Sequence, residues 1–245
     1  MSASSQVTGP LFKWFGSKWL SSATLPPPKY GSIVEPFAGG AAYSLRYSGK
    51  DVTICERDQF ILPLWKWLIE TATPSDIMEI PVNNREGDNI LDFDLSYGQK
   101  LLLKSWQRTN NVGRCWTISC WGCNGKGMWS RHVRDRIASE IGAIKHWKVF
   151  DDGMKVLREE TWEATWFVDP PYQYNYQYRG KPLCYDELSQ LILAARGQKI
   201  VCEAACPNTG RFPIWLPFED WGFRATSRAQ DGMNSVSREL LWVDG

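Results

Sequence analysis

A strand, a glycine turn, a helix and a second strand follow one another near the start of the chain, and this succession leaves few possible folds. The apolar run over residues 32–36 predicts a short buried strand, and Gly39 and Gly40 predict the turn that closes it. A helix is predicted to start over residues 41–47, and a second strand covers residues 51–56. Such a unit builds a parallel sheet with a right-handed crossover, so we predict an α/β domain.

The alternation of strands and helices resumes only after about residue 148. Asp186 is predicted to cap a helix that ends at residue 195. The remaining predicted strands cover residues 164–168, 199–203, 223–227 and 239–243. We therefore expect residues 1–58 and 148–245 to form one α/β domain.

The intervening residues 59–147 have a different, mainly helical pattern and are predicted to form an inserted domain. Ser130 can cap a helix whose apolar positions recur at intervals of four, four and three residues. These positions are Val133, Ile137, Ile141 and Ile144. Residues 97–108 also have a helical pattern.

The positive charge of the chain is concentrated in this region. Between Lys104 and Lys148 there are nine Lys or Arg and two acidic residues, so this segment carries a charge of +7 in a chain of net charge +1. A basic face of this kind suits phosphate binding, although solvated helix surfaces often carry such charge as well.

The composition is that of an ordinary globular protein. With 245 residues and 43% hydrophobic content, the chain can bury a substantial core. The first residues lack the pattern of a signal peptide, and the apolar stretch 60–69 is interrupted by Pro63 and Lys66, so we expect a cytoplasmic protein without a membrane partner. The seven cysteines are expected to be reduced.

The run Asp169-Pro170-Pro171-Tyr172 follows the apolar strand that ends at Val168 and suits the binding of an exocyclic amino group. The nitrogen of such a group on a nucleobase is a poor nucleophile, because its lone pair is delocalised into the ring. A carboxylate and a backbone carbonyl can accept its two hydrogens, the prolines stiffen the turn, and the tyrosine offers a face for stacking.

Glu56 lies seventeen residues after Gly39, at the end of the second predicted strand. In α/β folds an acid near this spacing binds ribose hydroxyls, and a glycine turn lets backbone amides approach a ligand. The pair therefore suggests a cofactor that carries adenosine, although the glycine pattern is neither that of a dinucleotide site nor that of a P-loop.

Four ordered motifs resemble the Dam-type DNA adenine-N6 methyltransferases. They are Phe12-Lys13-Trp14-Phe15-Gly16-Ser17-Lys18, Glu35-Pro36-Phe37-Ala38-Gly39, Ile54-Cys55-Glu56-Arg57-Asp58 and Asp169-Pro170-Pro171-Tyr172. The resemblance covers most of the chain and is weakest in the insertion. It implies a Rossmann-like sheet of the S-adenosylmethionine-dependent methyltransferase type, with residues 59–147 as the domain that recognises double-stranded DNA.

The resemblance also implies the role of individual residues. The cofactor S-adenosylmethionine would be bound by Trp14, Lys18, Pro36, Phe37, Gly39, Glu56, Asp152 and Asp169, with Asp151 as the alternative to Asp152 near the adenine. The catalytic residues would be Asp169, Pro170 and Tyr172, and the DNA contacts Asn124, Lys126, Arg131 and Arg134. This chain departs from the family at three positions: Ala41 stands where a further glycine is usual, Glu56 replaces Asp, and Gly153 replaces an aromatic residue.

The implied reaction is direct methyl transfer to N6 of an adenine that has been flipped out of duplex DNA. A cytosine-C5 methyltransferase would need a Pro-Cys nucleophile, and the chain has only the reversed pair Cys206-Pro207. Two alternatives stay open: transfer to an amino group of RNA or of another base, and a catalytically silent protein that binds nucleic acid. Cys120 and Cys123 form a single pair without a second one, so buried thiols are expected there in preference to zinc.

Overall fold

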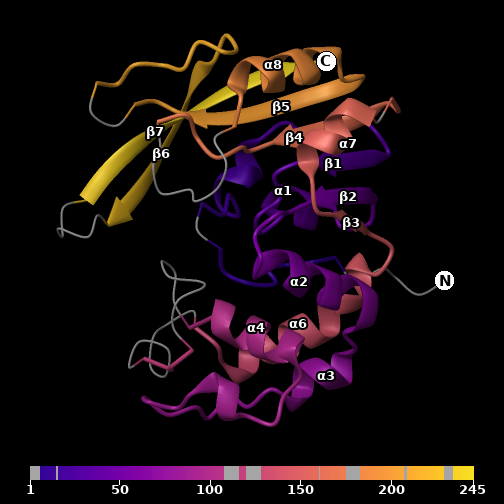
Figure 1. Ribbon diagram of the computed structural model, residues 1–245, viewed down its shortest axis with the longest axis vertical. Helices are drawn as coiled ribbons and strands as arrows, with labels where there is room; N and C mark the ends of the chain where they lie inside the picture. Colours follow the sequence, from indigo (N-terminus) through magenta and orange to yellow (C-terminus); the bar gives the residue numbers. More distant parts are fainter. Residues whose placement is uncertain are drawn as a thin grey trace. The chain divides into compact units, whose positions relative to one another are not determined.

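The computed structural model describes residues 6–14, 16–107, 116–119, 128–159, 161–174, 183–206, 209–228 and 234–245. In this part of the chain seven strands form one sheet, in the order β3-β2-β1-β4-β5-β7-β6 (Figure 1). The strands are β1 (Ser32–Glu35), β2 (Asp51–Cys55), β3 (Lys148–Phe150), β4 (Ala164–Val168), β5 (Gly197–Ala204), β6 (Glu219–Arg228) and β7 (Asn234–Asp244). This mixed α/β fold confirms the predicted fold class at that level and is compatible with a Rossmann-like fold.

Contacts between Cα atoms divide the chain into two compact units. One unit comprises residues 1–23, 39–52 and 56–151, and the other comprises residues 24–38, 53–55 and 152–245. They are called the helical unit and the sheet unit below. The domain boundaries expected from the sequence stay a prediction.

The sheet unit contains parallel strands and an antiparallel edge. β1 pairs with β4 and β4 with β5 in parallel, whereas β7 pairs with both β5 and β6 in antiparallel fashion. β4 is buried along its whole length, because its residues face packed side chains on both sides of the sheet. The helices α7 (Gly153–Glu159) and α8 (Tyr185–Ala194) contribute Val156, Leu157, Leu188 and Ile192 to the same core as Trp166 and Val201.

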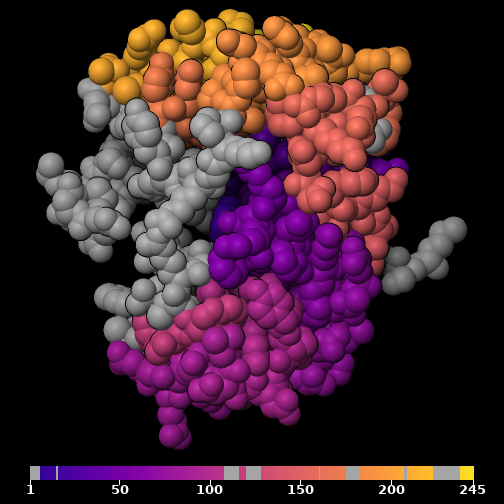
Figure 2. All heavy atoms as spheres, in the orientation of Figure 1, coloured from indigo at the N-terminus to yellow at the C-terminus, as the bar shows by residue number. Residues whose placement is uncertain are grey.

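The helical unit holds α1 (Ala42–Arg46), α2 (Ile61–Lys66), α3 (Pro74–Glu79), α4 (Tyr97–Ser105) and α6 (Arg131–Glu140). α3 packs against α6, and α2 packs against α4. Short 3₁₀ helices are formed by Ser21–Thr24, Ile90–Asp92 and Ile141–Ile144, and a π-helix is formed by Trp67–Thr71. The space-filling view shows the atoms of the α3–α4 segment closely packed against one another (Figure 2). The mainly helical character expected for residues 59–147 is therefore found in their described part.

Most predicted elements are confirmed, with shifted ends. Ser130 caps α6 by accepting a hydrogen bond from the backbone N–H of Val133, as predicted. The α-helix ends at Glu140, however, and Ile141–Ile144 continues as a 3₁₀ turn. The predicted cap at Asp186 is wrong: Cys184 holds the N-cap position without a side-chain hydrogen bond, and Asp186 lies in the first turn of α8.

Candidate functional site

Gly39, in the helical unit, has both of its backbone polar groups hydrogen-bonded, and the Trp14 ring lies where a side chain would be. Its φ of +50° lies in the left-handed region, where glycine is favoured. Its N–H donates a hydrogen bond to Glu56 Oε2 over 3.0 Å, and its carbonyl accepts one from Trp65 Nε1 over 2.8 Å. A Cβ at this position would lie 2.8 Å from Cδ1 of Trp14, so the indole ring leaves no room for a side chain. The structure thus brings together three of the predicted cofactor residues: Trp14, Gly39 and Glu56.

Glu56 is half-buried, and both of its carboxylate oxygens accept backbone hydrogen bonds. Oε2 accepts from Gly39, and Oε1 accepts from the N–H of Asp58 over 2.8 Å. Burial raises the pKa of Glu56, the charge of Asp58 acts in the same direction, and the backbone donors act against it. Each oxygen has two lone pairs, so one on each remains for a further donor. The side chain can therefore accept hydrogen bonds from two neighbouring hydroxyl groups while it holds the Gly39 turn.

Lys18 lies in the same unit and is buried, with 8% of its surface exposed. Its ammonium group donates to the carbonyl of Gly16 over 3.4 Å, in the turn where the Ser17 N–H donates to the Trp14 carbonyl. Lys18 is thus tied to the turn that carries Trp14.

Two predicted site segments in the sheet unit follow the carboxyl ends of neighbouring parallel strands. Ile33 and Val34 of β1 pair with Thr165 and Trp166 of β4, which fixes the register. Pro36 comes directly after β1, and Asp169 directly after β4. The structure therefore places Pro36 and Asp169 at one edge of the sheet, where open α/β sheets bind ligands.

Asp152 directly precedes α7, and its side chain caps the N-terminus of that helix. Its Oδ1 accepts a hydrogen bond from the backbone N–H of Lys155 over 3.1 Å, and the side chain is exposed. The next residue, Gly153, touches the turn after β1: an added Cβ would lie 1.8 Å from the carbonyl oxygen of Pro36. Asp151 belongs to the helical unit, and the choice between the two aspartates stays a prediction.

The catalytic tetrapeptide predicted from the sequence is held by neighbouring elements of the sheet unit. Asp169 is half-buried, Pro170 is buried, and Tyr172 is 8% exposed. The hydroxyl of Tyr172 donates a hydrogen bond to Glu239 Oε2 over 2.8 Å, and the hydroxyl of Tyr185 donates to the carbonyl of Pro171. The hydroxyl end of the Tyr172 side chain is therefore anchored to β7.

Sequence reasoning missed two buried acids beside this tetrapeptide, Glu203 on β5 and Glu239 on β7. Burial, together with the nearby charge of Asp169, raises the pKa of Glu203 to about 7, against hydrogen bonds from Ala204, Trp215 and Gln173 that lower it. An acid that follows the apolar run Ile200-Val201-Cys202 inside a strand was the only available signal.

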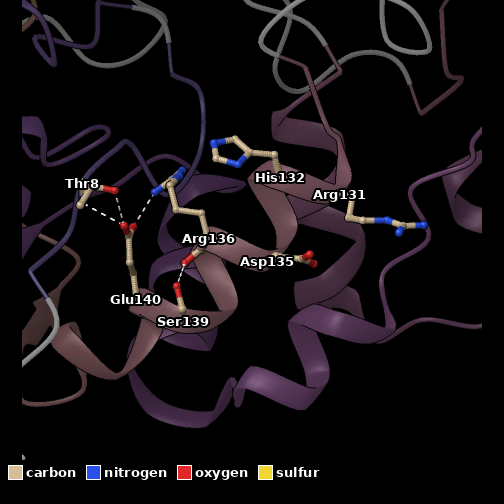
Figure 3. A pocket seen from close by; sticks show the side chains of 7 residues that line it. All are labelled: Thr8, Arg131, His132, Asp135, Arg136, Ser139 and Glu140. Atoms are coloured by element: carbon tan, nitrogen blue, oxygen red, sulfur yellow. Dashed lines mark hydrogen bonds and ion pairs between the residues drawn. The ribbon is translucent and has the colours of Figure 1, made fainter.

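The predicted DNA contacts differ in how accessible they are. Arg131 is exposed, whereas Arg134 is half-buried and bonds to Asp135 and to the carbonyl of Met78. Asn124 and Lys126 lie outside the described residues. An open depression of about 690 Å³ lies along α6; there Arg131 points away from Glu140, while Arg136 points toward it (Figure 3).

Not all of the basic segment is available to phosphates. Arg136 donates to the carbonyls of Gly9 and Pro10 and pairs with Glu140. Lys104 is buried, with its ammonium group 3.7 Å from the ring centroid of Trp116. These two cations are used inside the helical unit.

A scan against models of known protein families matched none of them, and a search of the curated proteins found no match. No helix within the described ranges is long and apolar enough to cross a membrane. Among the residues that the structure describes, no three His, Cys, Asp or Glu are grouped to hold a metal ion, and Cys120 and Cys123 lie outside them.

Proposed function

We propose that this chain transfers a methyl group from S-adenosylmethionine to N6 of a flipped adenine in duplex DNA. One observation carries the proposal: Asp169-Pro170-Pro171-Tyr172 directly follows the carboxyl end of β4, beside the turn that follows β1. Ligands bind at this edge of parallel sheets. A half-buried carboxylate, a proline carbonyl and a fixed aromatic ring there suit a planar amino substrate.

The residues present fit the cofactor chemically. In the helical unit, Glu56 keeps two lone pairs for the ribose hydroxyls, and Trp14 and Lys18 are held in the turn that packs on Gly39. In the sheet unit, Pro36, Phe37, Asp152 and Asp169 are the proposed contacts. Gly153 has no room for the aromatic side chain usual in the family, so the half-buried ring of Phe37 is proposed to pack on the adenine instead.

The cofactor would supply an electrophilic methyl group bound to sulfur. The Asp169 carboxylate and the Pro170 carbonyl would accept hydrogen bonds from the two N–H groups of the adenine amino group, which orients the nitrogen lone pair toward that methyl. The bond from nitrogen to the methyl carbon would form as the bond from sulfur to that carbon breaks, and the nitrogen would then release one proton to solvent. Tyr172 would stack on the base, with its ring held by Glu239. Positioning and stabilisation of the charge that develops on nitrogen supply the catalysis, and no covalent enzyme intermediate forms.

The test is to incubate the protein with labelled S-adenosylmethionine and duplex DNA, then digest the DNA to nucleosides. We expect labelled N6-methyl-2′-deoxyadenosine among the products, and its absence from the digested DNA would overturn the proposal. Parallel incubations use RNA and other bases as acceptors. Transfer to one of these would indicate a different amino acceptor. No transfer to any acceptor would indicate a protein that binds nucleic acid without catalysis.

Asp169→Ala should abolish transfer and leave the fold intact, because the side chain follows the strand and does not belong to its buried core. Glu163→Ala is the matched control, since this exposed carboxylate precedes the same strand and only pairs with Arg196 at the surface. Full activity of the Asp169 variant would contradict the role assigned to it.

A further inference from the structure

Two buried carboxylates lie on neighbouring strands beside the tetrapeptide. β5 and β7 are antiparallel, and their register pairs Ala204 with Glu239 and Glu203 with Leu240. Glu203 is fully buried, and Glu239 is 3% exposed. Buried acids are costly, so their retention in a strand core calls for groups that they hold.

These two acids hold two consecutive residues of the chain. Glu239 accepts a hydrogen bond from the Tyr172 hydroxyl over 2.8 Å. Glu203 Oε2 accepts one from the backbone N–H of Gln173 over 3.4 Å and one from Trp215 Nε1 over 3.1 Å. Its other oxygen, Oε1, accepts from the N–H of Ala204 over 3.0 Å. The end of the tetrapeptide is therefore tied to both strands through side-chain carboxylates.

We propose that Glu203 and Glu239 are positioning residues that hold the segment Asp169–Gln173 in the geometry that methyl transfer requires. This inference rests on the proposed function and deepens it. Neither acid touches the substrate: Glu239 acts through the ring of Tyr172, and Glu203 acts through the backbone of Gln173.

The hold of Glu203 depends on its charge. Its three hydrogen-bond partners in the structure are N–H donors, which the carboxylate accepts best when it is ionised. Burial raises the pKa of Glu203 to about 7, and the nearby charge of Asp169 acts in the same direction. Protonation below that pH removes an acceptor from the site, so the transfer rate falls as the pH is lowered through this range.

The first experiment compares Tyr172→Phe, Glu239→Gln and the double variant in steady-state methylation of duplex DNA. Each single change should lower kcat by roughly tenfold with KM changed less than about twofold, because geometry is lost and binding is not. Since Glu239 acts through Tyr172, the double variant should be no slower than the slower single variant. Losses that multiply in the double variant would overturn the proposal. Glu219→Gln, an exposed acid on β6, is the control.

The second experiment measures kcat against pH for the wild type and for Glu203→Gln. The wild-type rate should rise between about pH 6 and pH 8, and the variant rate should be low and flat over that range. A variant profile that keeps the wild-type shape would contradict the role of Glu203.

A third readout needs no activity: hydrogen exchange of a peptide that covers residues 169–174. Glu203→Gln and Glu239→Gln should speed exchange of its amides by about tenfold over the wild type and the Glu219→Gln control. Unchanged exchange refutes the positioning. Accelerated exchange in a protein that methylates no nucleic acid refutes the proposed function and the catalytic consequence, so the two failures are distinguishable.

Discussion

Replacing Glu203 by Gln should change how the stability of the protein depends on pH. The pKa of this buried carboxyl is raised from its ordinary 4.5 to about 7 in the folded protein. Between these two values the folded state holds a proton that the unfolded state has lost. Folding stability therefore falls as the pH rises from about 4.5 to about 7, and the full cost of the buried charge is present above pH 7.

The size of this effect follows from the two pKa values. Their difference, at about 1.4 kcal/mol for each pH unit, gives about 3 kcal/mol of stability lost between pH 4.5 and pH 8. The side chain is fully buried, so solvent screens this cost little. Gln cannot ionise, and it loses an acceptor for the N–H donors of Gln173 and Trp215, which costs roughly 1–3 kcal/mol at every pH.

The assay is urea unfolding of the wild type and of Glu203→Gln at pH 4.5, 6 and 8, at constant ionic strength. The loss of hydrogen bonds does not depend on pH, so it cancels when the two proteins are compared across pH. The contribution of Glu56 to the pH dependence also cancels, because its raised pKa is present in both proteins. The wild type should lose about 3 kcal/mol more than the variant between pH 4.5 and pH 8. Glu163→Gln, which changes an exposed carboxylate, is the control. An equal pH dependence in wild type and Glu203→Gln would refute the reasoning.

Three other outcomes are expected. Gly153→Ala should cost at least about 2 kcal/mol in urea unfolding, because its Cβ would meet the Pro36 carbonyl, whereas Gly31→Ala has open space and should change little; equal effects would argue against the contact. Ser130→Ala should cost about 1 kcal/mol through the lost cap of α6, and an unchanged midpoint would contradict it. Glu56→Gln should weaken S-adenosylmethionine binding roughly tenfold in equilibrium dialysis, and unaltered affinity would exclude the ribose contact.

The elements that were predicted correctly are those whose secondary structure is determined by their own residues. β4 is apolar at every position except Thr165, and α6 carries both a capping serine and a regular apolar stripe, so local pattern and tertiary burial agree. The start of α8 was misplaced at Asp186 because a tertiary contact decides it: Tyr185 packs against Trp215 and bonds to Pro171, and the helix begins at that tyrosine. The short strand β3 was missed, since it has three residues and none of them is buried.

In the candidate site, too, the residues that belong to local motifs were predicted and those that depend on tertiary contacts were not. Trp14, Gly39 and Glu56 were found because each belongs to a recognisable motif, and the structure brings them together. Glu203 and Glu239 were missed, because only the register of β5 against β7 brings these two strand positions together, with the side chains on opposite faces of the sheet. A buried acid that serves another residue's geometry leaves little trace in the sequence around it.

The three departures from the methyltransferase pattern that the sequence resembles have separate physical consequences. Ala41 adopts φ +46°, a left-handed conformation that glycine adopts more readily and that puts strain on the start of α1. The carboxylate of Glu56 reaches both the Gly39 and the Asp58 amides, so the longer acid still closes the turn. At Gly153 the Pro36 carbonyl leaves no space for a side chain. Under the proposed function, packing on the adenine ring therefore has to come from another residue, and Phe37 is the one proposed for it.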